Sequence, residues 1–210
     1  MEIEAKFVVP DATMFSAVLQ LEQLGAFRLV AEMEPEQQHN IYFDTADGRL
    51  RAQRHGLRVR DLGDRRIATL KGAAHVHDGV YERDEWEVEV GDSNQPGDWP
   101  AGEVRDRVLA LADGAPLAPI LMIDTQRHHL YAWHEQRRVA EISVDEGTIH
   151  AGGRAEPFRE LEVELLDAGT RAEFDALVSA LRGHFALVPE ERSKLARGLA
   201  LLDGSKPSPL

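Results

Sequence analysis

Several segments of the sequence place charged and apolar residues at alternating positions, and this pattern limits the fold more than any other feature. The chain opens with EIEAK, and later segments read LRVR, YERDEWEVEV and ELEVEL. Side chains of a β-strand point alternately to its two faces, so each segment predicts a strand with one charged and one apolar face. An antiparallel sheet with one solvated face is one explanation. A sheet whose charged face surrounds an interior space is the other.

The identity of the charged residues favours an interior space. These positions carry mostly Arg, Lys and Glu, with few of the Thr, Ser and Gln residues that a solvated face would include. Their sign changes along the chain, with Arg58, Arg60 and Lys71 in the middle and carboxylates towards both ends. The three glutamates of ELEVEL repel one another unless cations lie between them. Such a sheet needs helices over its apolar outer face, and the sequence predicts at least four.

The rest of the pattern predicts a single α+β domain over residues 1–202. Helices are expected from a cap at Asp11 to about Leu24, where Gly25 would stop the helix, and at about 103–113, 170–183 and 191–202. Strands are expected at 2–9, 28–33, 38–45, 56–61, 65–71, 79–90, 120–134, 138–147 and 156–166. Residues 203–210 read as a tail or linker.

Composition excludes several classes of protein. The net charge of −13 argues against general nucleic-acid binding, which needs a basic surface. The chain has no cysteine, so it has neither disulfides nor a thiolate metal site. No apolar run approaches the ~18 residues of a membrane span, and the acidic N-terminus is unlike a signal peptide. We therefore expect a cytoplasmic protein that binds neither membranes nor nucleic acid.

An interior lined by both signs of charge suits a particular kind of ligand. Carboxylates bind hard cations such as Mg²⁺ or Mn²⁺ through oxygen. Arginine and lysine bind phosphate oxygens, and arginine does so with two parallel hydrogen bonds. The alternating segments therefore predict a site for a metal-complexed polyphosphate chain.

The order of the motifs resembles that of the CYTH domain, or triphosphate tunnel metalloenzyme family. EIEAK resembles its ExExK signature, and YFDT, LRVR, TLK, an RxE strand, VDEG, ELEVEL and SKLARG follow in the family's order. The chain looks most similar to bacterial inorganic triphosphatases. The resemblance implies a closed antiparallel barrel, or tunnel, of about eight strands with helices outside. In that branch a helical CHAD domain often follows, so a CHAD domain is a candidate partner in a longer chain.

The resemblance also implies roles for individual residues. The implied metal ligands are Glu2, Glu4 and Asp145, with two or more of Glu160, Glu162 and Glu164. The implied phosphate-binding residues are Lys6, Arg58, Arg60, Lys71, Arg83, Arg127, His129 and Lys194. Glu85 and Glu87 are implied to orient the basic groups or to contact a second metal, and they join Glu2, Glu4 and Lys6 as the catalytic set. His129 stands where Lys or Arg is usual, which predicts a weaker or pH-dependent contact.

The implied reaction is the hydrolysis of inorganic triphosphate to pyrophosphate and phosphate with Mg²⁺ or Mn²⁺. The alternatives are a nucleotide or thiamine triphosphatase, a class IV-type adenylyl cyclase, and a non-catalytic polyphosphate-binding module. A module of the last kind would not need the metal-binding carboxylates, so their presence favours an enzyme. The sequence does not predict the oligomeric state or the preferred metal.

Other short motifs are expected to be structural. HVH at residues 75–77 is expected to be a solvated loop rather than a metal site. His128 and His129 would point to opposite faces of a strand and cannot chelate as a pair. DTADG lacks the remaining ligands of a calcium loop. YFDT is expected to supply core aromatic residues and to end in a turn.

Overall fold

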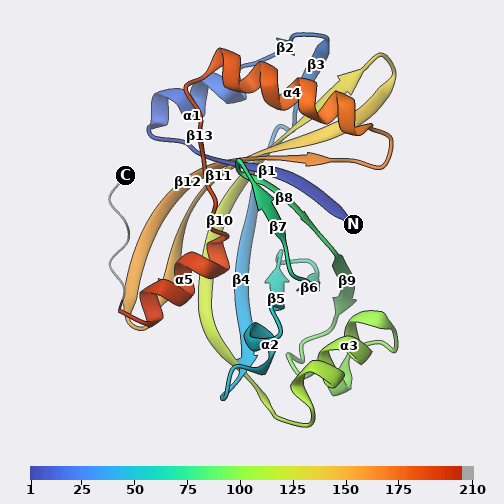
Figure 1. Cartoon of the computed structure of the whole chain (residues 1–210), viewed down its shortest axis with the longest axis vertical. Coiled ribbons are helices and arrows are strands. Elements are labelled where there is room, and N and C mark those ends of the chain that lie inside the picture. Colours follow the sequence, from blue (N-terminus) through green and yellow to red (C-terminus); the bar gives the residue numbers. More distant parts are fainter. Residues whose placement is uncertain (205–210) are drawn as a thin grey trace.

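The computed structural model describes residues 1–204 and shows an α+β fold built around one antiparallel sheet (Figure 1). Its strands are β1 (Glu2–Val8), β2 (Gln23–Leu24), β3 (Phe27–Ala31), β4 (Glu36–Thr45), β5 (Gly56–Asp61), β6 (Arg66–Lys71), β7 (His75–His77), β8 (Val80–Arg83), β9 (Glu85–Val90), β10 (Leu117–His134), β11 (Arg137–Ala151), β12 (Arg154–Leu165) and β13 (Val188–Pro189). The helices are α1 (Ala12–Leu19), α2 (Arg49–Ala52), α3 (Glu103–Ala112), α4 (Arg171–His184) and α5 (Lys194–Leu202), with a 3₁₀ turn at Pro96–Asp98. The predicted α+β class is confirmed.

The main path of the sheet runs in the order β7-β8-β1-β12-β11-β10-β4-β5-β6-β9. Strands β8 and β9 are consecutive in the chain and are separated by Asp84. Strand β8 pairs with β1, whereas β9 pairs with β6. One segment of chain therefore contacts two strands that are far apart in the sheet order. Among the described strands, no ladder joins β9 back to β7 or β8, so the strand pairing does not show a closed barrel, and the sheet has 13 strands rather than about eight.

Strand β1 shows why the charged and apolar residues alternate. Ala5 and Phe7 are fully buried and pack in a core with Phe174 of helix α4. Glu4 and Lys6 point to the opposite face, and they are only 3% and 5% exposed. Both faces of the strand are therefore buried. For β1, the first explanation, a sheet with one solvated face, is wrong.

Helices cover the apolar outer face of the sheet in three places (Figure 1). Helices α1 and α4 pack over one end and share a core with β1, β11 and β12. Helices α2 and α3 pack against β5, β6 and β9 at the other end. Helix α5 lies against β10 and β11, where a Cβ atom on Gly198 would come within 2.5 Å of the Leu121 side chain. None of these described helices is long and apolar enough to cross a membrane.

Several predicted boundaries were wrong for identifiable reasons. The first helix ends at Leu19 rather than Leu24, because Gln23–Leu24 pairs with Phe27 and Arg28 in a short hairpin. The last helix begins at Lys194 rather than at 191, with Ser193 as its cap. HVH is the exposed strand β7, so the predicted loop was wrong and the predicted solvation was right.

Three long strands also extend further than predicted. Strand β10 begins at Leu117 rather than 120, β11 continues to Ala151 rather than 147, and β12 begins at Arg154 rather than 156. Helices α3 and α4 lie within a residue or two of the predicted ranges, and the predicted cap Thr170 forms a capping box with Glu173. The predicted tail begins at the end of α5, and its residues 205–210 lie outside the described part of the chain.

The motif YFDT, with the following DTADG, precedes and stabilises a short helix that the sequence analysis did not predict. Phe43 is in the core, as expected, while Tyr42 lines the interior cavity described below. The Asp44 carboxylate, 2% exposed, accepts hydrogen bonds from the backbone N–H groups of Thr45 and Leu50 at 2.8 and 2.9 Å. These bonds fix the four-residue helix α2 against the end of β4.

Candidate functional site

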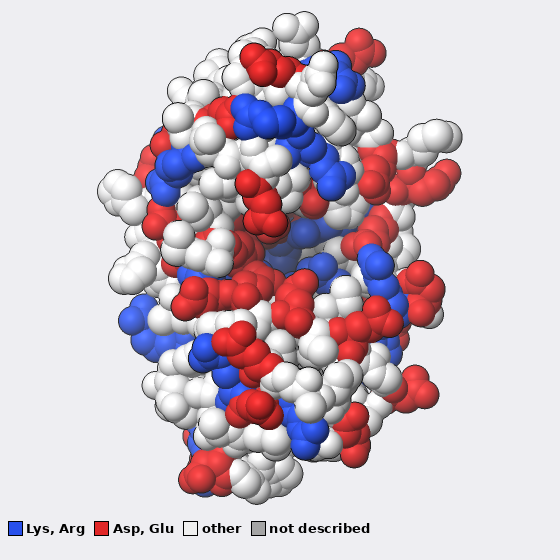
Figure 2. Space-filling view, turned by 90° about the vertical axis from the view of Figure 1, so that its right-hand side faces the viewer, with Lys and Arg blue, Asp and Glu red and all other residues white. Residues whose placement is uncertain are grey.

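The charged faces of the strands surround a cavity of about 760 Å³, called the central cavity below. Every site residue predicted from the sequence lines it except Glu160. Figure 2 shows, on one face of the molecule, a hollow with basic side chains in its depth and acidic side chains around it. A larger hollow of about 1180 Å³ shares Gln38, Leu62 and Thr125 with the central cavity but contains none of the predicted residues. The charged residues predicted from the sequence therefore converge on one place.

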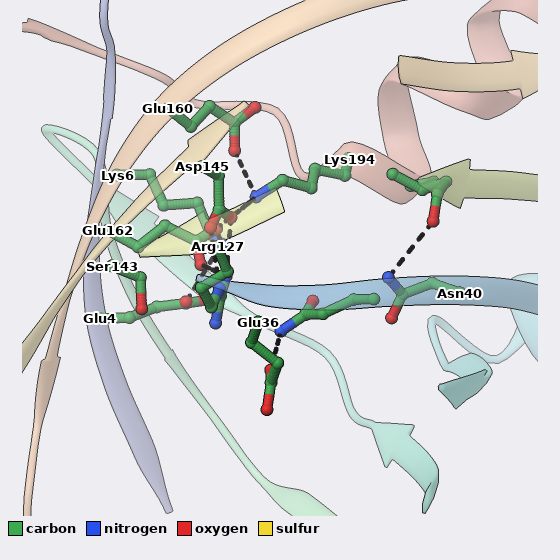
Figure 3. A network of polar contacts seen from close by, with 12 residues as sticks. Glu4, Lys6, Glu36, Asn40, Arg127, Ser143, Asp145, Glu160, Glu162 and Lys194 are labelled. Atoms are coloured by element: carbon green, nitrogen blue, oxygen red, sulfur yellow. Dashed lines mark hydrogen bonds and ion pairs between the residues drawn. The ribbon is translucent and has the colours of Figure 1, made fainter. Parts of the chain in front are cut away.

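A group of buried ion pairs borders the central cavity and is called the paired cluster (Figure 3). Its members are Lys6, Arg127, Asp145, Glu160, Glu162 and Lys194. Arg127 lies 2.7 Å from Asp145 and 2.6 Å from Glu162. Lys194 Nζ lies 3.0 Å from Asp145 and 2.8 Å from Glu162, and Lys6 Nζ lies 2.5 Å from Glu162. Strands β1, β10, β11 and β12 and the first turn of α5 are thus joined by one network.

These contacts keep the paired cluster charged despite its burial. Burial opposes the charged form of Asp145, but Arg127 and Lys194 hold its pKa below the ordinary value. For Glu162, Lys194 and Lys6 outweigh burial in the same way and hold the pKa far below its usual range. Burial also opposes the charge on Lys6, yet Glu162 raises its pKa above the ordinary value. The cluster therefore contains both signs of charge at neutral pH.

Glu160 is the one predicted residue that the structure does not bring to the cavity wall. Its side chain is fully buried, and Arg197 of α5 bonds to it at 2.5 Å. Lys194 Nζ also lies 2.7 Å from it, and Arg197 reaches on to Glu156 at 2.6 Å. These contacts hold helix α5 against β12. The sequence analysis did not identify Arg197, which lies three residues after Lys194 and so on a neighbouring part of the same helix.

A second group of ion pairs joins β1 to the segment β8–β9 and to β6. Arg83 bonds to Glu2 at 2.7 Å and also to Glu4. Lys71 Nζ lies 2.9 Å from Glu2 and 2.7 Å from Glu85. The contact with Lys71 agrees with the predicted role of Glu85 in orienting a basic group, which stays a prediction.

Negative charge is in excess around Glu164. The strand register places Glu164 directly opposite Glu4 on β1 and opposite Glu141 on β11. Burial, and then repulsion by Glu2, Glu4 and Glu141, raise the pKa of Glu164 to about 7. Among residues 1–204, Glu164 has no Lys or Arg nitrogen within 4.0 Å. A cation at this place would relieve the repulsion, and carboxylate oxygens are the donors that a hard divalent cation prefers.

The predicted metal ligands are not already arranged around a common point. In the described part of the chain, no three His, Asp or Glu side chains form a group that could hold a metal ion. Asp145 and Glu162 are bonded to Lys and Arg instead. Glu2 and Glu4 also contact Lys or Arg, whereas Glu164 contacts none among residues 1–204. The group of Glu2, Glu4 and Glu164 best fits a cation, because, in addition to burial, the repulsion within it raises the pKa of Glu164.

Positive charge is in excess around Arg58 and Arg60. The Nε atom of Arg58 is buried without a hydrogen-bond partner among the described residues, and the nearest carboxylate to its guanidinium is Glu87 at 3.9 Å. Arg60 donates to the amide oxygen of Asn40 at 3.1 Å. Burial, and then repulsion by Arg58 and Arg127, lower the pKa of Arg60 to about 10. This part of the cavity therefore favours an anion.

His129 behaves as a cation. Its Nδ1 atom lies 2.7 Å from Glu141, and its Nε2 atom lies 3.8 Å from Glu36. Burial opposes the charged ring, but hydrogen bonds with Glu141 and Glu36 raise the pKa of His129 to about 9. At neutral pH the residue thus supplies the positive charge of the Lys or Arg that it replaces in the motif. A pH-dependent contact with phosphate stays a prediction.

The sequence analysis missed several residues of the cavity wall. On β4 these are Glu36, Gln38, Asn40 and Tyr42. The first three lie in the segment EQQHN, which is polar on both faces, so no alternation marks the interior side. Glu141 lies at the same alternating positions as Asp145 on β11, but the sequence analysis gave it no role. Arg51 and Arg54 lie in and after helix α2, which has no strand periodicity to mark them.

Comparisons with known proteins place the chain in a family. The model of the CYTH domain matches residues 1–199. The chain belongs to the CYTH domain family. The resemblance found in the sequence is thereby confirmed.

Relatives of this CYTH domain include an inorganic triphosphatase of Haemophilus influenzae, 28% identical over 173 residues that cover 80% of this chain and 46% of that protein. An uncharacterized protein of Mycobacterium tuberculosis is 30% identical over 216 residues, covering 95% of this chain and 40% of that protein. The chain thus spans less than half the length of these curated relatives. Among solved structures, HpAC1 from Hippeastrum superposes with a TM-score of 0.74 at 20% identity, covering 96% of this chain and 97% of that one. This likeness shows a shared fold.

Proposed function

We propose that this CYTH domain is a metal-dependent hydrolase of inorganic triphosphate, which it cleaves to pyrophosphate and phosphate. The observation that carries the proposal is the presence of two opposite charge excesses in one cavity. Arg58 and Arg60 supply uncompensated positive charge, and Glu164 with its neighbours supplies uncompensated negative charge. A polyanion together with a cation satisfies both at once. The inorganic triphosphatase of Haemophilus influenzae, a relative of this chain, supports this choice of reaction.

In this proposal the chain's own residues bind and orient the substrate. Arg58 and Arg60 donate to phosphate oxygens, with Lys71, Arg83, Arg127, His129 and Lys194 as further donors around the same cavity. Lys6 joins the paired cluster to Glu4, because its Nζ atom lies 2.5 Å from Glu162 and 3.0 Å from Glu4. Its ammonium group therefore stands where the phosphate-binding and the carboxylate-rich parts of the cavity meet.

Enzymes of this family are metal-dependent, and in this proposal Glu2, Glu4 and Glu164 would hold the metal, which we propose to be Mg²⁺ or Mn²⁺. A divalent ion at such a site neutralises charge on phosphate oxygens and lowers the pKa of a bound water. Asp145 and Glu162 stay in the proposal as further ligands, which requires Lys6 or Lys194 to exchange a carboxylate partner for a phosphate oxygen. Glu85 and Glu87 orient the basic side chains.

We also propose that the sheet works as a tunnel. The segment Val80–Val90 connects β1 with β6 through its two halves, β8 and β9. This covalent connection supports a complete wall around the substrate, although it does so without a ladder between the two edges. Cytoplasmic residence and a CHAD domain in a longer chain remain expectations from the sequence.

The test is a phosphate-release panel with Mg²⁺ and with Mn²⁺ on triphosphate, pyrophosphate, ATP and thiamine triphosphate. Pyrophosphate should reach only part of the basic set, and ATP must leave its nucleoside at one mouth. Losing two charged hydrogen bonds at roughly 1.5–3 kcal/mol each predicts a kcat/KM for triphosphate about a hundredfold or more above that for either.

Other results would identify the alternatives on the same fold. Comparable turnover of ATP or thiamine triphosphate would replace the proposal with a triphosphatase for that substrate, and formation of cyclic AMP would identify a cyclase. Tight binding of triphosphate without any turnover would identify a polyphosphate-binding module.

A further inference from the structure

The basic lining of the central cavity continues beyond the interior arginines. Arg51 of helix α2, and Arg54 and His55 just after it, line the same cavity as Arg58 and Lys71. Arg51 and Arg54 are exposed, whereas the Arg58 side chain is 12% exposed. Positive charge therefore extends from the depth of the cavity to its rim beside α2.

The rim beside α2 has a fixed structure. The buried Asp44 carboxylate accepts a hydrogen bond from Leu50 N–H at 2.9 Å and another from Arg51 N–H at 3.3 Å. Leu50 is 1% exposed and anchors the helix in the core. A four-residue helix has little stability of its own. These contacts therefore determine where the Arg51 side chain and the following turn lie.

Arg54 occupies a backbone position that ordinarily favours glycine. Its φ angle is +60°, in the left-handed region. The N–H of Arg54 bonds to the Arg51 carbonyl, and the N–H of His55 bonds back to the Leu50 carbonyl, both at 2.9 Å, in the manner of a helix C-terminus that usually contains glycine. An unfavourable backbone at a non-glycine residue is typical of functional positions.

The guanidinium groups of the rim have little compensating negative charge. Among residues 1–204, Arg54 has no carboxylate oxygen within 4.0 Å, and its only side-chain hydrogen bond is to the Ala74 carbonyl at 3.5 Å. Arg51 Nε lies 3.9 Å from Asp44, a carboxylate already bonded to three backbone N–H groups. Both side chains are therefore available to an anion.

We propose that Arg54 and Arg51 form a rim subsite that binds the additional phosphoryl groups of a linear polyphosphate longer than triphosphate. The inference rests on the proposed function, because it assumes that three phosphoryl groups occupy the interior near Arg58 and Lys71. The remaining groups of a longer chain then emerge at the rim beside α2. Guanidinium groups suit them, since each can bind two phosphate oxygens at once.

The decisive variant is Arg54→Gly, which removes the charge and gives the left-handed backbone the residue that suits it. The measurement is isothermal titration calorimetry with triphosphate, linear tetraphosphate and a longer size-fractionated polyphosphate, with a chelator present to prevent turnover. We expect the Kd of tetraphosphate and of the longer chain to rise about tenfold, which corresponds to one charged hydrogen bond. The Kd of triphosphate should change by less than about twofold, and the midpoint of urea unfolding should stay the same or rise. Arg54→Lys should restore part of the lost affinity.

Two control variants separate backbone from charge. Asp113→Gly replaces another residue of positive φ, +48°, at the C-terminus of α3 and outside the cavity. Arg28→Ala removes an exposed arginine of β3 that does not line the cavity. Neither should alter the dependence of affinity on chain length.

Three results would overturn the rim subsite: an equal loss of affinity for triphosphate and for longer chains, no loss for either, or no binding of any polyphosphate by the unaltered chain. The same experiments distinguish a failure of the rim subsite from a failure of the proposed function. If the unaltered chain shows the expected length dependence but does not hydrolyse triphosphate with metal, the subsite stands and the reaction is wrong. If it hydrolyses triphosphate while Arg54→Gly binds every chain normally, the reaction stands and the subsite is wrong.

Discussion

The paired cluster and the two arginines of β5 border the same cavity, but they differ in how their charges are balanced. The charges of the paired cluster have close partners of opposite sign, whereas the two arginines do not. In the paired cluster, Glu162 contacts Lys6, Arg127 and Lys194, and the pKa of Glu162 falls far below its usual range. On β5, Arg58 and Arg60 face one another's charge without a close carboxylate, and the pKa of Arg60 falls to about 10.

The contrast distinguishes charges that stabilise the fold from charges that are available to bind a ligand. Within the paired cluster each charge has a partner, and loss of one member would leave its partners buried and unpaired. On β5 the charges repel, so the folded chain gains nothing from keeping both in the absence of an anion. The two regions should therefore respond in opposite senses to the loss of a charge.

The largest effect should follow from Glu162→Gln in the paired cluster. Breaking a buried ion pair costs about 3–5 kcal/mol of the free energy of unfolding, because the cations left behind stay desolvated. Urea unfolding followed by circular dichroism measures this loss. Glu87→Gln is the control, since Glu87 is a half-exposed carboxylate of the same cavity and should cost only about 0.5 kcal/mol. An unfolding midpoint for Glu162→Gln equal to that of the unaltered chain would remove the distinction between the regions.

A smaller effect, and one on binding rather than folding, should follow from Arg60→Gln. The free energy of unfolding should stay the same or rise, because repulsion with Arg58 and Arg127 is relieved. The affinity for triphosphate should fall about a hundredfold if two charged hydrogen bonds of ~1.5 kcal/mol are lost. Calorimetry and urea unfolding on the same samples measure both quantities, with Arg28→Gln as the control. A clearly destabilised variant that binds triphosphate normally would show that Arg60 belongs with the paired cluster.

The smallest effect should follow from Glu164→Gln, and it depends on pH. The pKa of Glu164 is raised from 4.5 to about 7, so the folded chain holds this proton more tightly than the unfolded chain does. The stability that this proton contributes is present below the unfolded pKa and is lost as the pH rises through about 7. Thermal unfolding at about pH 5 and about pH 8 should therefore show a steeper loss in the unaltered chain than in the variant.

Addition of Mg²⁺ tests whether the excess negative charge around Glu164 is a cation site. If the excess negative charge is the cation site, adding Mg²⁺ at the higher pH should raise the melting temperature of the unaltered chain more than that of Glu164→Gln. Glu89→Gln, which removes an exposed carboxylate of β9 outside the cavity, should respond like the unaltered chain. An equal response in all three chains would place the cation elsewhere.

The sequence predicted the strands that line the cavity because their two faces differ so strongly. Strand β1 ends within one residue of the predicted range, and the charged positions of β12 point inward at Glu162 and Glu164 as the alternation indicated. Alternation fixes the face of a side chain, but it does not fix the register between strands. The placement of Glu164 opposite both Glu4 and Glu141, which creates the excess charge, could therefore not be predicted.

The parts that sequence reasoning missed depend on tertiary contacts. Helix α2 is stabilised by hydrogen bonds from its backbone to the Asp44 carboxylate at the end of β4, and no local propensity marks four residues as helical. The contact of Arg197 with Glu160 depends on the docking of α5 against β12, which joins residues 37 positions apart. Such contacts between remote segments leave no periodic signal.

The position of β1 in the sheet has a consequence for how the chain acquires its structure. Strand β1 pairs with β8, with β12 and with Val188–Pro189, so all of these partners lie far from it along the chain. Such distant pairings slow folding, because a long loop must close before any contact forms. Strand β8 can pair with β1 first, but until β12 has been made the other edge of β1 stays unpaired. The site thus depends on late pairings, although Glu2, Glu4 and Lys6 precede its other lining residues in the sequence.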